Sequence, residues 1–100
     1  MPKAKRIILL GATGSIGSNT LKIIQQFPDD FQLVGISACR NSQALAQIAE
    51  TYKVQSIALS DESTYQSAIE EDLFSKHCKI YGGDQALHQI IAVSYTHLRA

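Results

Sequence analysis

The sequence predicts an α/β fold in which parallel strands alternate with helices. Short apolar runs end at glycine or turn residues, and between them lie stretches whose apolar residues recur at helical spacing. The resulting order is strand then helix, repeated along the whole chain. Helices long enough to cross over make neighbouring strands parallel, and such crossovers are right-handed. We therefore expect the first half of a doubly wound parallel sheet.

The first predicted strand leads through a glycine into the first predicted helix. Residues 6–10 (RIILL) form an apolar run, which is typical of a strand buried on both faces. The helix after it ends before Pro28, because this proline and the two aspartates behind it stop a helix. Its apolar residues roughly share one face. They are Ile16, Leu21, Ile23, Ile24 and Phe27.

The remaining elements follow the same alternation. Residues 31–37 (FQLVGIS) are rich in β-formers and predict the second strand. The other predicted elements are a helix over 43–52 capped by Asn41 or Ser42, a strand over 56–59, a helix near 62–74, a strand over 79–81 and a helix from Asp84 through Ile91. In the helix over 43–52, the inward-facing positions are Ala44, Leu45, Ile48 and Ala49.

Length and composition limit the possible functions. A chain of 100 residues makes one small domain, and its formal net charge of +0 gives no electrostatic reason to expect a nucleic-acid or membrane partner. The apolar run at residues 7–10 is too short for a signal peptide, and nothing approaches the length of a membrane span. Cys39 and Cys78 lie in no metal or redox motif. These features predict a cytoplasmic protein with free thiols.

Three glycines crowd the turn between the first strand and the first helix. Gly11 ends the strand where the chain must turn sharply. Gly14 has no Cβ, so a ligand's pyrophosphate can approach the backbone, and Gly17 allows the helix to pack closely on the strand. Because the motif follows a strand and opens a helix, it predicts a Rossmann-like dinucleotide-binding unit. A glycine-rich turn without a ligand is the alternative.

The residues between these glycines complete a phosphate cradle. The amides of Ser15 and Ile16 lie at the helix N-terminus, where they lack intrahelical partners and the helix dipole favours negative charge. Thr13 and Ser15 add hydroxyl donors. The P-loop is excluded, because no Gly-Lys-Ser/Thr sequence follows. The predicted site binds a diphosphate without a side-chain cation of its own.

The end of the second strand indicates which dinucleotide is bound. NAD sites place Asp or Glu there to bind the ribose 2′-hydroxyl. This chain has no acidic residue at that place and carries Arg40 instead, followed by Asn41 as a further polar contact. A guanidinium favours a 2′-phosphate through charge and paired hydrogen bonds, so the pattern predicts NADP(H). An ordinary exposed loop cation is the alternative for Arg40.

No catalytic or metal-binding group stands out. The histidines at positions 77, 88 and 97 have no metal-ligand spacing, and the acidic run at 70–72 is most simply a solvated face. Cys39 beside Arg40 is most simply a small residue in a turn. We predict no catalytic residue and no metal ligand in this chain.

Three segments resemble the start of the 1-deoxy-D-xylulose 5-phosphate reductoisomerase family: ILLGATGSIGSNTLKII, PDDFQLVGISACRN and ALAQIAETYKVQSIAL. The glycine spacing, the Pro and Phe before the second strand, and the basic residue and Asn after it all match, over about residues 5–91. The resemblance places cofactor contacts on Thr13, Gly14, Ser15, Ile16, Cys39, Arg40 and Asn41. The family usually has Gly where Cys39 stands, which weakens Cys39 as a contact. It also commonly has Ser where Ala12 stands, which is a mild change.

The resemblance also implies an activity. Family members convert a phosphosugar, 1-deoxy-D-xylulose 5-phosphate, to 2-C-methyl-D-erythritol 4-phosphate, using NADPH and Mg²⁺ or Mn²⁺, in non-mevalonate isoprenoid synthesis. It implies a homodimer for the full-length protein, with metal ligands and substrate site in later domains. We therefore expect residues 1–92 to be a partial NADP(H)-binding domain that is inactive alone, and residues 93–100 to be a non-native tail.

Two other functions remain open at this stage. Semialdehyde dehydrogenases and extended short-chain reductases also use Gly-Ala-Thr-Gly turns. Neither Tyr81 nor Tyr95, however, is followed by Lys as in a Tyr-x-x-x-Lys motif. A non-catalytic module that senses NADP(H) is the third possibility.

Overall fold

Four parallel strands form one sheet in the order β1-β2-β3-β4. The computed structural model describes residues 5–99, and for Ile16 and residues 93–99 it describes the backbone alone. The strands are β1 (Lys5–Leu9), β2 (Phe31–Ala38), β3 (Ser56–Leu59) and β4 (Lys79–Gly82). The helices between and after them are α1 (Ser15–Gln26), α2 (Ser42–Tyr52), α3 (Glu62–Glu70) and α4 (Ala86–Arg99). The predicted alternation of parallel strands and helices is confirmed.

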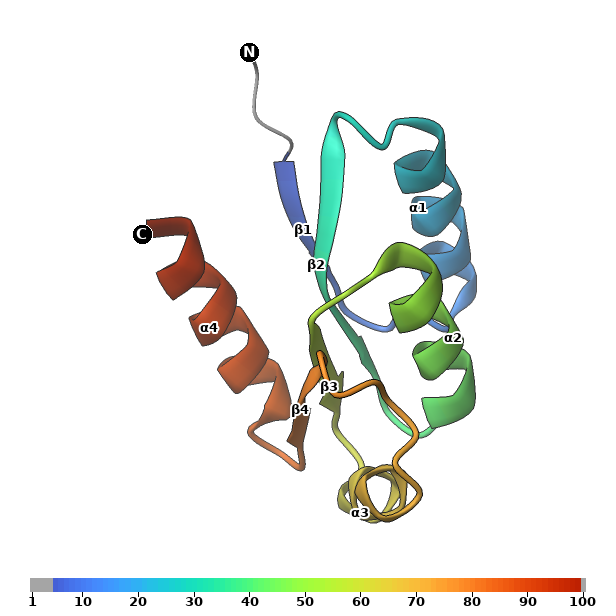
Figure 1. The fold of residues 1–100 in the computed structure, drawn as a ribbon, viewed down its shortest axis with the longest axis vertical. Helices are drawn as coiled ribbons and strands as arrows, with labels where there is room; N and C mark the ends of the chain where they lie inside the picture. Colours follow the sequence, from blue (N-terminus) through green and yellow to red (C-terminus); the bar gives the residue numbers. More distant parts are fainter. Residues whose placement is uncertain (1–4, 100) are drawn as a thin grey trace.

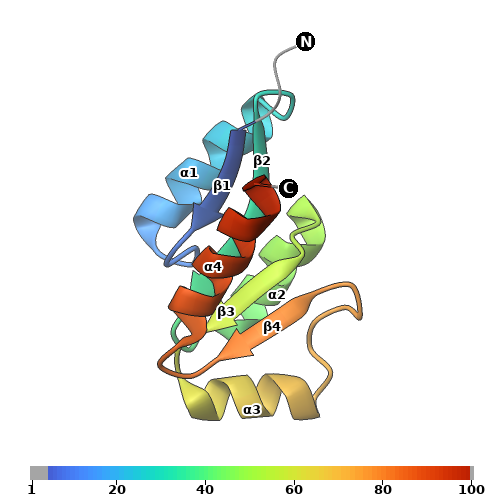
Figure 2. The same ribbon diagram turned by 90° about the vertical axis from the view of Figure 1, so that its left-hand side faces the viewer.

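The helices lie on both faces of the sheet. Figure 1 shows α1 and α2 on one face and α4 on the other, with α3 below the sheet beside β4. In Figure 2, α4 crosses in front of the sheet, and its residues contact β4, β3 and β2. Right-handed crossovers that step one way across a sheet keep their helices on one face. The change of face at α4 therefore marks a reversal of winding, as expected of a doubly wound sheet.

The core between the sheet and α1 differs from the predicted helix face. Gly17, Leu21 and Ile24 are buried against the sheet, at the three- and four-residue spacing of a single helix face. Ile23 and Phe27 are 51% and 49% exposed, so their assignment to the inner face was wrong. Of the predicted inward-facing residues of α2, Leu45 and Ala49 are buried, and Ala44 and Ile48 are half-buried.

Two predicted helix ends also require correction. Helix α3 ends at Glu70 rather than near residue 74, because Asp72 adopts a left-handed backbone conformation with φ 53°. The Leu73 N–H then donates to the Ala68 carbonyl at 3.0 Å, and Phe74 is buried from the loop that follows. Helix α4 begins at Ala86, two residues after the predicted cap.

The last helix continues well past its predicted end. Its backbone is helical through Arg99, where the sequence predicted a helix only through Ile91. The side chains of residues 93–99 lie outside the described residues, as does residue 100. A non-native tail from position 93 therefore stays a prediction.

Candidate dinucleotide-binding site

Two of the three glycines in the turn are required by the fold itself. Gly11, two residues after the end of β1, has φ +71°, a left-handed conformation that strains any residue with a Cβ. A Cβ on Gly17 would lie 2.5 Å from the Ala12 carbonyl oxygen and 2.8 Å from that of Gly11. Both contacts are with backbone atoms, which cannot rotate away. The turn and the close packing of α1 therefore account for glycine at both positions.

Gly14 is different, because the protein's own structure does not require glycine there. Its φ of −86° and ψ of 178° are accessible to any residue. A Cβ would meet only the Gly11 carbonyl oxygen, at 3.7 Å, which is ordinary van der Waals contact. Gly14 is also exposed, so the space that a side chain would fill is open to a ligand. The open space over the Gly14 backbone, which would let a ligand come close, is the site's most informative feature.

Gly14 is the N-cap of α1, and no side chain caps this helix. The first helical hydrogen bond runs from the Ser18 N–H to the Gly14 carbonyl at 2.9 Å, so the amides of the first turn lack intrahelical partners. Ser15 is exposed and Thr13 half-buried, which leaves the helix mouth uncovered by their side chains. Backbone amides and the dipole of α1 together suit an anion here.

The neighbouring strand β2 holds the turn in place. The Gly11 N–H donates to the Ser37 hydroxyl at 3.0 Å, and the Ala12 N–H donates to the Ser37 carbonyl at 2.8 Å. Sequence reasoning did not single out Ser37. Its only signal was one hydroxyl near the end of a mostly apolar strand.

The predicted cofactor residues after β2 are all exposed. These are Cys39, Arg40 and Asn41. Asn41 caps α2, where its side-chain oxygen accepts from the Ala44 N–H at 3.4 Å, so this residue has a structural role as well. The Cys39 carbonyl accepts from the Asp61 N–H at 3.2 Å, and its thiol is free.

Arg40 forms an ion pair with Asp61, which lies two residues beyond the end of β3. Its Nε lies 3.6 Å from an Asp61 carboxylate oxygen at the end of β3, and the Arg40 side chain is 79% exposed. Asp61 caps α3 by accepting from the Thr64 N–H at 3.0 Å and the Thr64 hydroxyl at 2.8 Å. The Thr64 hydrogen bonds, and to a lesser extent Arg40, lower the pKa of Asp61. Asp61 thus orients Arg40 toward β3 through Nε, and the guanidinium has further N–H groups for a ligand.

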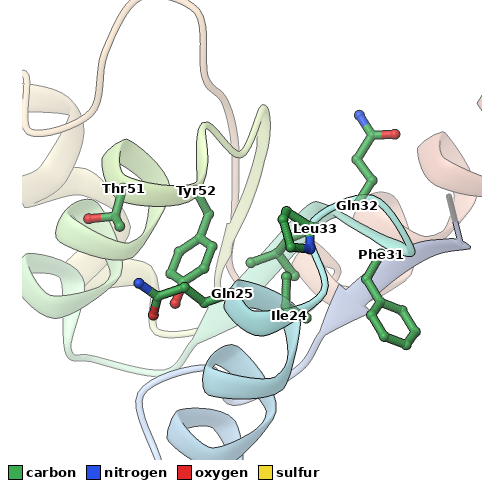
Figure 3. Close-up of a pocket in the computed structure, with 8 residues that line it drawn as sticks. Ile24, Gln25, Phe31, Gln32, Leu33, Thr51 and Tyr52 are labelled. Atoms are coloured by element: carbon green, nitrogen blue, oxygen red, sulfur yellow. The ribbon is translucent and has the colours of Figure 1, made fainter.

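Two cavities lie at the opposite end of the sheet. One, of about 460 Å³, opens between the last turn of α1, the start of β2 and the end of α2 (Figure 3). Tyr52 lines it and donates its hydroxyl to the Leu21 carbonyl at 3.2 Å. The other, of about 710 Å³, lies between the end of α2 and the loop before β4 and includes Cys78, whose thiol pKa is raised by burial. Neither contains a predicted cofactor residue.

The described part of the chain offers neither a metal centre nor a membrane-spanning helix. Within it, no three His, Cys, Asp or Glu side chains gather where they could hold a metal ion. Within the same residues, no helix combines the length and apolar character needed to cross a bilayer.

Parallel strands, a glycine turn and an open helix N-terminus at the strand ends together define a Rossmann-like α/β unit. The sequence model of the 1-deoxy-D-xylulose 5-phosphate reductoisomerase family matches residues 7–98, and the chain belongs to this family. The match favours this family over the semialdehyde dehydrogenases and short-chain reductases.

Individual relatives agree with this assignment. The chain is 34% identical to the 1-deoxy-D-xylulose 5-phosphate reductoisomerase of Proteus mirabilis, over 89% of this chain and 23% of that protein. It is 46% identical to the Rippkaea orientalis enzyme, over 59% of this chain and 15% of that protein. A structure of the Zymomonas mobilis enzyme in complex with NADPH matches 88% of this chain and 23% of its own, with a TM-score of 0.78 and 31% identity. The chain therefore spans less than a quarter of the length of these relatives.

Proposed function

We propose that this chain binds NADPH through the turn between β1 and α1. The observation that carries the proposal is Gly14: the fold tolerates a side chain at this position, yet the position faces open space at the mouth of α1. A ligand that must come close to the backbone accounts for glycine there. The NADPH complex of the related Zymomonas mobilis enzyme supports this choice of ligand.

Different residues of the site bind different parts of the cofactor. The pyrophosphate lies over Gly14 and is held by the first-turn amides, including those of Ser15 and Ile16, with Thr13 and Ser15 as hydroxyl donors. Arg40 holds the 2′-phosphate by charge and by hydrogen bonds from its free N–H groups. Asn41 contributes through its side-chain amide, and Cys39 through its backbone. When bound, NADPH supplies a hydride, and these residues bind and orient it.

For the whole protein, we propose the activity of the family. Its substrate is 1-deoxy-D-xylulose 5-phosphate, and its product is 2-C-methyl-D-erythritol 4-phosphate. The proposed Mg²⁺ or Mn²⁺ finds no donor set among the described side chains, so we assign no metal-dependent step to them. The two free thiols support a reducing, cytosolic location.

The decisive experiment compares Gly14→Ala with Gly17→Ala. Gly14→Ala creates no clash, and replacing glycine by alanine at an N-cap costs at most about 1 kcal/mol of unfolding free energy. We expect it to weaken NADPH binding at least about tenfold, which corresponds to roughly 1.4 kcal/mol. Gly17→Ala brings a Cβ against backbone and is expected to lower stability by about 1–3 kcal/mol.

Binding is measured by nicotinamide fluorescence and calorimetry, and stability by urea unfolding. A folded Gly14→Ala variant that binds NADPH as tightly as the wild type would refute the proposal. As a separate check, the chain is assayed with 1-deoxy-D-xylulose 5-phosphate, Mn²⁺ and NADPH. We expect no turnover, and turnover above the blank would show that catalytic residues lie within these 100 residues.

A further inference from the structure

Ser37 is buried at an unusual place for a hydroxyl. Among the side chains that the structure describes, it is the one polar side chain in the buried class, at 3% exposed. Its neighbours in β2, Ile36 and Ala38, are apolar and also buried. A buried hydroxyl is costly unless it is hydrogen-bonded, so its partner indicates what it does.

The partner of this hydroxyl is the first glycine of the turn. The pairing of β1 with β2 ends at Leu9 and Ile36, after an irregularity in register between Ile7 and Ile8. Beyond that point the backbone ladder stops. Gly11 then turns into the left-handed region, and its N–H donates to the Ser37 hydroxyl at 3.0 Å.

A second bond makes the attachment specific. The Ala12 N–H donates to the Ser37 carbonyl at 2.8 Å, so one residue of β2 holds two successive amides of the turn. The carbonyl bond uses backbone only and would survive any substitution. The hydroxyl bond depends on the side chain and holds the Gly11 N–H. Through Gly11 it sets the position of Gly14, whose N–H donates to the Gly11 carbonyl at 3.2 Å.

We propose that Ser37 is a positioning residue for the phosphate-binding turn. It does not touch the cofactor, but it keeps the turn in the conformation that binds the pyrophosphate. This inference rests on the proposed NADPH binding. Because NADPH and NADH carry the same pyrophosphate, loss of the hydroxyl weakens both by the same factor. The preference for the 2′-phosphate belongs to Arg40 and does not change.

The test uses two matched pairs at this position in the full chain. Ser37→Ala removes the hydroxyl from the native side chain, and Ser37→Val differs from Ser37→Thr only by a methyl in place of the hydroxyl. We expect the Ala variant to bind NADPH and NADH about fivefold more weakly than the wild type, because fewer molecules hold the competent turn. The Val variant should bind more weakly than the Thr variant by the same factor. Ser56→Ala, at the first residue of the neighbouring strand β3, serves as the control and should leave both dissociation constants unchanged.

Each outcome either supports or overturns the positioning role of Ser37. Equal weakening of both nucleotides, with an unchanged NADPH-to-NADH ratio and recovery in the Thr variant, supports positioning. Wild-type affinity in a folded Ala variant overturns it and leaves NADPH binding intact. A smaller fraction of active protein with an unchanged dissociation constant also overturns it, because Ser37 would then act on stability alone. If the Ala variant does not fold, the Thr and Val pair decides. Failure of the wild type to bind NADPH refutes the proposed function itself.

Discussion

The two ends of the sheet contrast in what they offer a ligand. At the carboxyl ends of the strands lie a glycine turn, an uncapped helix N-terminus and an exposed arginine. At the other end lie two cavities lined by helix ends and loops, with Tyr52 and Cys78 among their walls (Figure 3). The carboxyl end offers first-turn amides without intrahelical partners and an exposed guanidinium, whereas the opposite, hollow end offers two cavities.

This contrast follows from the topology. In an alternating parallel fold every helix starts at the carboxyl edge of the sheet, so the positive ends of the helix dipoles collect there. The opposite edge collects helix C-termini, which disfavour anions. The Tyr52 hydroxyl there is bound to the Leu21 carbonyl, and burial disfavours ionisation of the Cys78 thiol. Both of these cavities therefore lie at the end of the sheet away from the proposed cofactor turn.

Arg40→Asp should produce the largest change in cofactor preference. It replaces the guanidinium with a charge that repels a 2′-phosphate, so NADPH should weaken relative to NADH by roughly 1–3 kcal/mol. The measurement is the pair of dissociation constants for NADPH and NADH in full-length protein. Equal loss of both cofactors would count against the role of Arg40.

Lys76→Asp provides the control for this change of net charge. Lys76 lies in the loop before β4, at the hollow end of the sheet. Its substitution should leave the ratio of the two dissociation constants unaltered. A similar shift in both variants would mean that the overall field of the protein, rather than Arg40 itself, selects the cofactor.

Much of the fold could be predicted from local patterns. The predicted strand at 56–59 has the same bounds as β3, and the predicted helix over 43–52 ends at the same residue as α2. The end of α3 was not, because the apolar Leu73 and Phe74 continue the helical pattern while Asp72 breaks the backbone. Phe74 reaches the core from a loop, and only the tertiary fold places it there.

The site divides in the same way. The glycine motif could be predicted because its spacing is a local property of the chain. The structure then separates Gly11 and Gly17, which the fold needs, from Gly14. The contacts that Ser37 and Asp61 make at the site could not be found from sequence, because each joins segments that lie far apart in the chain. Such bonds depend on strand register, including the irregularity between Ile7 and Ile8, which no pattern in the sequence indicates.

Tyr52→Phe sharpens the comparison from the hollow end. Loss of the hydroxyl bond to the Leu21 carbonyl should lower the free energy of unfolding by about 1 kcal/mol. The dissociation constant for NADPH should stay at the wild-type value. Thr51→Ala, an exposed neighbour on the same cavity wall, should change stability by less than about 0.5 kcal/mol. Weaker NADPH binding in Tyr52→Phe would show that the two ends of the sheet are coupled.

The smallest expected effect concerns acid stability at the carboxyl end. The pKa of Asp61 is lowered in the folded protein, chiefly by the Thr64 hydrogen bonds, so its carboxylate contributes stability above its unfolded pKa of about 3.9. That contribution disappears as the pH falls through the lowered folded pKa. Asp61→Asn keeps a capping oxygen for α3 but has no charge to lose. Its urea midpoint should therefore fall less than that of the wild type between pH 5 and pH 3, which is roughly one unit either side of the unfolded pKa. Asp29→Asn, in the exposed turn before β2, retains the Asp61 carboxylate and should follow the wild type. Parallel acid profiles for Asp61→Asn and the wild type would mean that the charge on Asp61 does not stabilise this end of the sheet, and that its contact with Arg40 is only a matter of proximity.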